Sequence, residues 1–136
     1  MADGVRNIQA EFGGFTEHWS PRVIATANGQ YVKLAKVRGE FVWHSHADED
    51  EVFIVFRGRL TIRFRDRDDV TLGEGDVFVV PKGVEHCPVA EEECWLMLFE
   101  PAQTKHTGDV ETPFTKSVDQ QLAAGAAGGG YAAGSN

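Results

Sequence analysis

Apolar and polar residues alternate in short runs between residues 22 and 100, and each run ends at a turn signal. The runs are RVIAT, QYVKLAKV, EVFIVF, RLTIRF, DVTL, DVFVV and ECWLMLF. Alternation with a period of two is typical of strands that bury one face. Asn28-Gly29 favours a tight hairpin between the first two runs, because both residues tolerate positive φ. This spacing predicts an antiparallel sandwich or barrel, and we expect no long helix within it.

The segments outside these strands differ in composition. Residues 1–20 are an N-terminal arm, residues 21–104 the barrel, residues 105–122 a polar exit segment with a short helical turn at its end, and residues 123–136 a low-complexity tail. The apolar anchors of the arm are Phe12, Phe15 and Trp19. The tail, AAGAAGGGYAAGSN, is too poor in large apolar residues to offset its ordering entropy, so we expect it to be disordered.

The overall charge and the two cysteines indicate which kinds of binding partner and which cellular compartment to expect. A chain of 136 residues is of single-domain length, and its formal net charge of -8 disfavours nucleic acid and anionic membranes as partners. No stretch approaches the roughly 20 apolar residues of a membrane span, and the first residues contain no apolar leader. Cys87 and Cys94 match no zinc motif or disulfide framework. We therefore expect a cytoplasmic protein whose partners are a small molecule and a second copy of itself.

The stretch HSHADEDE, residues 44–51, carries the first candidate chemistry. His44 and His46 point to the same side of a strand, because side chains alternate. Glu51 lies an odd number of residues after His46, so it joins them only if residues 47–50 form a turn that resets the phase. Asp50 is the main alternative carboxylate. An acidic turn that is merely solvated is the competing interpretation of the stretch.

A second cluster follows the strand DVFVV. Pro81-Lys82-Gly83 has the residue types of a type I turn, and His86 comes three residues after Gly83. A histidine between apolar strands is often a hydrogen-bonded core residue. Here His86 would enter the same interior as the first two histidines.

Together the two clusters resemble the two motifs of the cupin superfamily. The first reads Gly39, four residues, His44-Ser45-His46, four residues, Glu51, six residues, Gly58. The second reads Gly75, five residues, Pro81-Lys82-Gly83, two residues, His86, three residues, Ala90. The chain departs from the family by one residue fewer after the first glycine and by Ala90 in place of an asparagine. The resemblance covers about residues 22–100 and implies an all-β, antiparallel jelly-roll barrel, also called a double-stranded β-helix.

The resemblance also implies a metal site. Its ligands would be His44, His46, Glu51 and His86, and Glu51 is preferred to Asp50 on the motif spacing. Three imidazoles and a carboxylate suit one divalent transition metal per chain, namely Mn, Fe, Ni, Co or Zn. Four protein ligands leave coordination positions open for water or substrate. The wall of the pocket is expected to contain Val42, Phe53, Val55, Trp95 and Met97.

Several other residues are expected to lie away from the metal. Alternation places Arg59, Arg63 and Arg65 on the outside, and it turns Cys87 away from the metal as a small buried residue. His18 and His106 lie outside both motifs, so surface or interface roles are expected for them. The apolar residues predicted on the opposite side of the strands are Phe41, Trp43, Val52, Ile54 and Phe56.

That apolar surface predicts a homodimer in which the arm reaches across to the partner. A monomer whose arm covers its own patch is the alternative. The leading functional hypothesis is a metal-dependent cupin enzyme of oxygenase or isomerase type that acts on a small organic metabolite. The alternative is a metal- or metabolite-binding module without catalysis, and the substrate, the native metal and the reaction are not fixed by the sequence.

Overall fold

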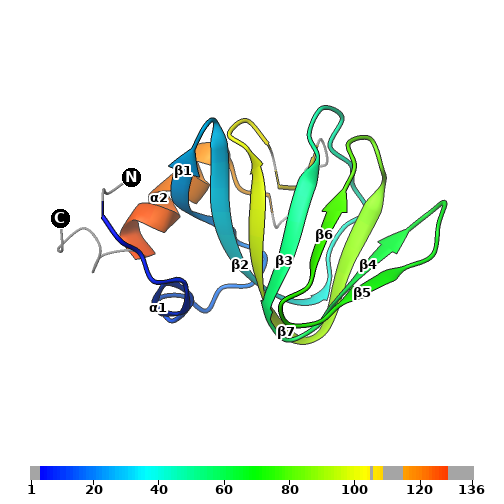
Figure 1. Ribbon diagram of the computed structural model, residues 1–136, viewed down its shortest axis with the longest axis horizontal. Helices are drawn as coiled ribbons and strands as arrows, with labels where there is room; N and C mark the ends of the chain where they lie inside the picture. The colour runs from blue at the N-terminus through cyan, green and yellow to red at the C-terminus, as the bar shows by residue number, and fades with distance from the viewer. Residues whose placement is uncertain (1–3, 105, 109–114, 129–136) are drawn as a thin grey trace.

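The computed structural model describes residues 4–104, 106–108 and 115–128 (Figure 1). Strands dominate it, with one short helix before them and one helix after them. In chain order the elements are α1 Ile8–Phe12, β1 Arg22–Ala27, β2 Gln30–Glu40, β3 Glu51–Arg57, β4 Leu60–Phe64, β5 Val70–Leu72, β6 Val77–Val80, β7 His86–Pro101 and α2 Val118–Gly128. The all-β jelly-roll fold that the sequence predicts is confirmed.

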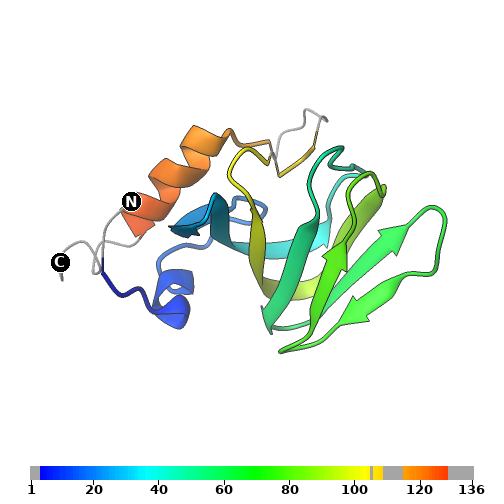
Figure 2. The same cartoon turned by 45° about the horizontal axis from the view of Figure 1, so that its top comes forward.

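The long strand β7 joins the two parts of the sheet. The strand order is β1-β2-β7-β3-β6, with β4 paired to both β7 and β5, and the pairs are antiparallel. Residues 86–89 of β7 pair with β4, whereas residues 95–99 pair with β3 on one side and with β2 on the other. Because β7 changes neighbours along its length, the sheet curls around an interior (Figure 2).

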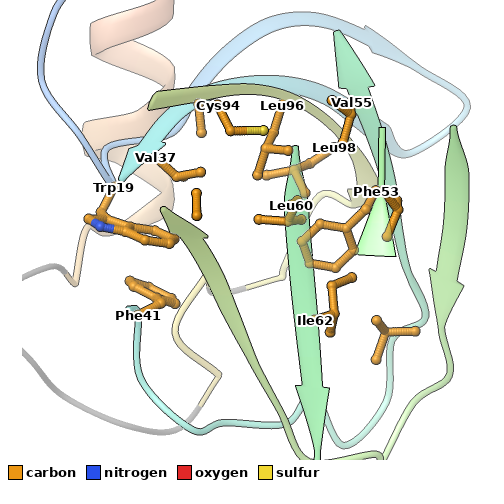
Figure 3. Close-up of a cluster of buried hydrophobic side chains, with 14 of the residues drawn as sticks. Trp19, Val37, Phe41, Phe53, Val55, Leu60, Ile62, Cys94, Leu96 and Leu98 are labelled. Carbon is orange, nitrogen blue, oxygen red and sulfur yellow. The ribbon is translucent and has the colours of Figure 1, made fainter. Parts of the chain in front are cut away.

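Alternation along the strands decides which side chains enter that interior. Phe53 and Val55 of β3 and Leu96 and Leu98 of β7 are buried, and they belong to one hydrophobic cluster with Leu60 and Ile62 of β4 (Figure 3). The register pairs Phe53 with Leu98 and Val55 with Leu96, so the odd residues of β3 and the even residues of β7 point to the same interior side. One end of this interior holds the histidine motifs.

The N-terminal arm covers the outer face of the sheet on its own chain. Phe12 of α1 is fully buried, and its ring stacks on Trp95 at 4.8 Å and on Phe56 at 5.4 Å between centroids. Leu34 and Ile24 complete this second cluster. Within the single chain described, the arm therefore packs against its own sheet, and whether it reaches across to a partner stays a prediction.

The C-terminal helix differs from what the sequence suggested. Helix α2 spans Val118–Gly128, so it is longer than a turn and crosses the boundary drawn at residue 123; residues 129–136 lie outside the described part of the chain. Ser117 and Gln120 exchange side-chain to backbone hydrogen bonds of 3.0 and 2.7 Å. This capping box and the alanines that follow explain why a helix forms in a low-complexity segment. No helix among the described residues is long and apolar enough to cross a membrane.

We predict that Phe12→Ala lowers the free energy of unfolding by about 3–5 kcal/mol, because it removes an aromatic ring that is stacked and fully buried. Chemical denaturation of the purified variant measures the loss. Val5→Ala is the matched control in the same arm, since Val5 is 83% exposed and its truncation should change stability little. Equal stability of both variants and the wild type would contradict the docked arm.

Candidate metal centre

Backbone pairing brings the three motif histidines and the motif glutamate to one end of the barrel interior. His44 and His86 form an isolated antiparallel bridge, with backbone N to O distances of 3.0 and 2.9 Å. His46 O accepts a hydrogen bond of 2.7 Å from Gly83 N, which ties the first motif to the second. Glu51 is the first residue of β3 and His86 the first of β7.

The acidic turn resets the phase as the ligand hypothesis required. Asp50 Oδ1 accepts a hydrogen bond of 2.8 Å from Lys82 N, so this carboxylate holds the turn against the second motif. Glu51 is buried and points inward with Phe53 and Val55. Asp50, the alternative carboxylate, is not part of the cluster that could hold an ion.

The four side chains place one ligand atom each within 4.8 Å of one another. Glu51 Oε1 lies 3.3 Å from His46 Nε2 and 3.5 Å from His86 Nε2. The four residues are 0–4% exposed. The sequence-predicted ligands His44, His46, Glu51 and His86 are therefore gathered in one small buried group.

Two backbone carbonyls fix which nitrogen of the histidines faces the cluster. His44 Nδ1 lies 2.9 Å from Val42 O, and His86 Nδ1 lies 2.9 Å from Val84 O. A carbonyl oxygen only accepts, so Nδ1 carries the proton in both rings and donates it. In its neutral form each ring then presents Nε2 as a lone pair, which is the arrangement of a metal-binding histidine.

The buried atoms of this cluster lack the partners that burial normally demands. His46 Nε2, His86 Nε2 and Glu51 Oε1 are buried without a hydrogen bond. Unpaired polar atoms in an interior are costly, and each such case calls for an explanation. A divalent cation at their common focus would satisfy these atoms at once, so the donor set fits a metal ion.

Burial and the single carboxylate set the pKa values in the cluster. Burial and the neighbouring His86 lower the pKa of His44 to about 4, so this ring is neutral at pH 7. Burial alone would raise the pKa of Glu51, but the imidazoles of His46 and His86, which face its Oε1 at 3.3 and 3.5 Å, hold that pKa well below its ordinary value. Burial opposes protonation of His46, yet the carboxylate of Glu51 beside it raises the pKa of this ring. Without an ion, Glu51 thus favours a proton on His46.

A second buried pair of titratable side chains lies beside the cluster. Lys33 of β2 and Glu100 of β7 are both fully buried, and Nζ lies 2.9 Å from Oε1. Burial and the charge of Glu51 raise the pKa of Glu100 to about 8, against the lowering effect of Lys33. Neither residue is predicted from the sequence to lie near the site. Their parity was the available signal, because Lys33 shares a face with Ala35 and Val37, and Glu100 shares one with Leu96 and Leu98.

A narrow cavity of about 40 Å³ opens onto the cluster. Its wall contains His44 and Glu51 together with Trp19, Pro21, Ala35, Val37, Phe41, Phe53, Pro88, Leu96, Leu98 and His106. Of the expected lining residues, Phe53 takes part. Val55 lies in the adjoining core and Val42 packs against it.

The expectation for Trp95 and Met97 is corrected. Both pack in the outer cluster with Phe12, because β7 turns its even residues inward. Phe41 is corrected in the opposite sense. It is 9% exposed, stacks on Trp19 with 4.4 Å between centroids and meets the His44 ring edge-on at 5.5 Å. The strand β2 ends at Glu40, so alternation no longer governs Phe41.

His106 is also placed where the sequence did not put it. It is 6% exposed, lines the cavity and stacks on Phe41 at 6.0 Å, because the chain after β7 folds back over the barrel end. His18 instead sits part-exposed and bonds Glu93 at 2.7 Å. The motifs gave no signal for His106.

The remaining residues lie where alternation predicted. Arg63 and Arg65 are exposed, pair with Glu40 and Glu85, and place their guanidinium groups over the Trp43 ring. Cys87 is a fully buried free thiol whose side chain contacts Pro88 O.

We predict that metal binding releases up to one proton near neutral pH, because Glu51 raises the pKa of His46 and so favours a protonated ring in the metal-free protein. Affinity should therefore weaken as the pH falls from about 7 to 5, whereas His44, with its pKa of about 4, adds no proton in this range. Calorimetric titration with Zn²⁺ in buffers of different ionisation enthalpy counts the protons. An affinity that does not change over this range would contradict the assignment.

Comparisons with known proteins agree with the fold and the motifs. Residues 30–100 match the Cupin domain family. A cupin-2 domain containing protein from Shewanella frigidimarina has 58% identity and a TM-score of 0.69, covering 71% of this chain and 94% of that chain. Protein NMB1881 from Neisseria meningitidis has 32% identity and a TM-score of 0.67, covering 71% and 98%.

A curated relative matches a shorter region. The uncharacterized protein YdbB of Bacillus subtilis is 43% identical over 63 residues, which are 46% of this chain and 56% of the relative. The alignment thus spans little more than half of that protein's length. From the matched residues, the barrel and the gathered motif side chains, the chain belongs to the cupin superfamily, as a cupin-2 type domain.

Proposed function

We propose that the protein is a metal-dependent cupin enzyme that binds one divalent transition metal through His44, His46, Glu51 and His86. The observation that carries the proposal is the group of buried, unpartnered ligand atoms at the end of a cavity. Mn, Fe, Ni, Co and Zn all suit this donor set. When bound, such an ion supplies a Lewis acid with positions open to a small organic metabolite.

The chain's own residues would prepare the site for this chemistry. Val42 O and Val84 O orient two of the imidazoles before any ion arrives. Leu96, Leu98 and Phe53 exclude water from the cavity wall, which strengthens electrostatic interactions inside it. Such an apolar wall around an ion with open positions supports an oxygenase or an isomerase type of reaction.

A non-enzymatic metal- or metabolite-binding module is the second candidate. The cavity of about 40 Å³ favours its metal-binding form, because pockets for organic ligands usually measure roughly 300–1,000 Å³. An enzyme acting on a larger metabolite would have to widen this cavity. Turnover and binding must therefore be measured separately.

We predict that Glu51→Gln weakens metal affinity by about a hundredfold or more and abolishes turnover, because the site loses its only carboxylate. Asp50→Asn is the matched control one residue away; it keeps a side-chain acceptor for Lys82 N and should leave metal affinity within about threefold of the wild type. Calorimetry measures affinity, and metabolite screens with and without O₂ measure turnover.

Tight metal binding without turnover of any metabolite would favour the binding module over the enzyme. Equal metal affinity in Glu51→Gln and the wild type would contradict the ligand set itself.

Self-association of the outer sheet is the second part of the proposal. β3 pairs with the edge strand β6 and with β7, and an apolar patch spreads across these strands. Its residues are Val52, Ile54, Val77, Val79 and Phe99. Val77 is 61% and Val79 46% exposed, which is unusual for an apolar row on a sheet. A second copy of the chain would cover this patch, and both free cysteines, Cys87 and Cys94, fit a reducing cytoplasm.

We predict that the wild type runs at twice its chain mass of 15.0 kDa and that Val77→Lys shifts it to the monomer, because a charge would enter the apolar interface. Light scattering after size exclusion measures the mass. Thr71→Lys, exposed on β5, is the control and should leave the dimer intact. A monomeric wild type at every concentration would contradict the interface.

A further inference from the structure

His106 enters the cavity from the segment that follows the barrel. It is 6% exposed and shares the cavity wall with His44 and Glu51. It is not one of the four clustered side chains that could hold an ion. His106 therefore borders the proposed metal site without being one of its four ligands.

One backbone hydrogen bond fixes the tautomer of this ring. Lys116 N donates to His106 Nε2 over 2.7 Å, so Nε2 is an acceptor and Nδ1 carries the proton. Burial and the nearby Lys33 charge lower the pKa of His106 to about 4, which keeps the ring neutral at pH 7. The bond to Lys116 N leaves Nδ1–H as the ring's own donor, and the ring lines the cavity.

An aromatic stack holds the ring in place. Phe41 lies between His106 and Trp19, with centroid distances of 6.0 and 4.4 Å (Figure 3 shows the Trp19–Phe41 pair). Trp19 has a φ of 58°, a left-handed conformation that bulky residues rarely adopt. Its backbone N donates to Lys36 O and its Nε1 to Arg38 O, and these bonds fix the residue at the cavity.

The charge of the site indicates what such a donor would meet. A divalent ion held with one carboxylate leaves a net positive charge, so an oxygen that carries negative charge is the favoured occupant. A free volume of about 40 Å³ has room for roughly three water-sized groups. The occupant in this conformation is accordingly a small oxyanion or the oxyanion end of a metabolite.

We propose that His106 donates a hydrogen bond from Nδ1 to a carboxylate or enolate oxygen of the ligand in this cavity, so that small organic oxyanions are the substrate class. The inference rests on the proposed metal site. His106 is then a substrate-contacting residue supplied from outside both motifs.

Two substitutions separate this role from a structural one. His106→Gln places an amide oxygen near the position of Nε2, so it keeps the acceptor for Lys116 N and loses the donor at Nδ1. His106→Asn places an amide nitrogen near Nδ1, so it keeps the donor and loses the bond to Lys116. Each variant is loaded with Co²⁺ and titrated with formate as the probe, and the visible absorbance of cobalt reports binding.

We expect wild-type affinity for Co²⁺ in both variants. Formate affinity should fall about tenfold or more in His106→Gln and stay within about threefold of the wild type in His106→Asn. Unchanged formate affinity in His106→Gln would overturn the inference, and so would equal weakening in both variants, which would indicate only that His106 anchors the segment.

A second readout needs no metal. Long-range ¹H–¹⁵N correlation spectra of the metal-free wild type should show His106 as the neutral Nδ1–H tautomer at pH 7. The Nε2–H tautomer would overturn the inference. Failure of the wild type to bind Co²⁺ would instead contradict the proposed metal site, so the two failures are distinguishable.

Discussion

The rest of the site depends on burying one carboxylate, Glu51, among three imidazoles. A carboxylate removed from water is strongly destabilising unless cations or donors surround it. Here His46 Nε2 and His86 Nε2 lie within 3.5 Å of Glu51 Oε1, and these imidazoles hold the pKa of the carboxyl well below its ordinary value. In the metal-free protein Glu51 favours a proton on His46, and a cation would replace this proton. The same arrangement therefore accounts for folding without a metal and for affinity towards one.

The barrel supplies the rigidity that this arrangement needs. The His44–His86 backbone bridge, the Gly83–His46 hydrogen bond and the carbonyls that hold two imidazoles fix the ligand atoms before an ion binds. Because β7 pairs with β2, β3 and β4, the end of the interior cannot open without disturbing much of the sheet. A preorganised ligand set of this kind favours affinity, since little conformational entropy remains to be lost.

The sequence predicts those residues of the site whose positions depend on local spacing along the chain. Motif spacing indicated His44, His46, Glu51 and His86, and alternation correctly placed Arg63, Arg65 and Cys87. It failed where a strand's phase depended on pairing, as for Trp95 and Met97, whose face is set by the register of β7 against β3. Lys33 and Glu100 were missed because lysine and glutamate are expected outside, whereas these two side chains are buried and lie 2.9 Å apart. His106 and Phe41 depend on chain segments beyond the strands, and α2 depends on a capping box inside a low-complexity stretch.

One metal ion bound between these four side chains would explain the whole site. Crystals grown with Co²⁺ and measured on both sides of the cobalt absorption edge would locate such an ion. We predict a single strong anomalous peak in the barrel, about 2.0–2.2 Å from His44, His46, Glu51 and His86. No peak there, or a peak only at the exposed acids Asp48 and Glu49, would contradict it.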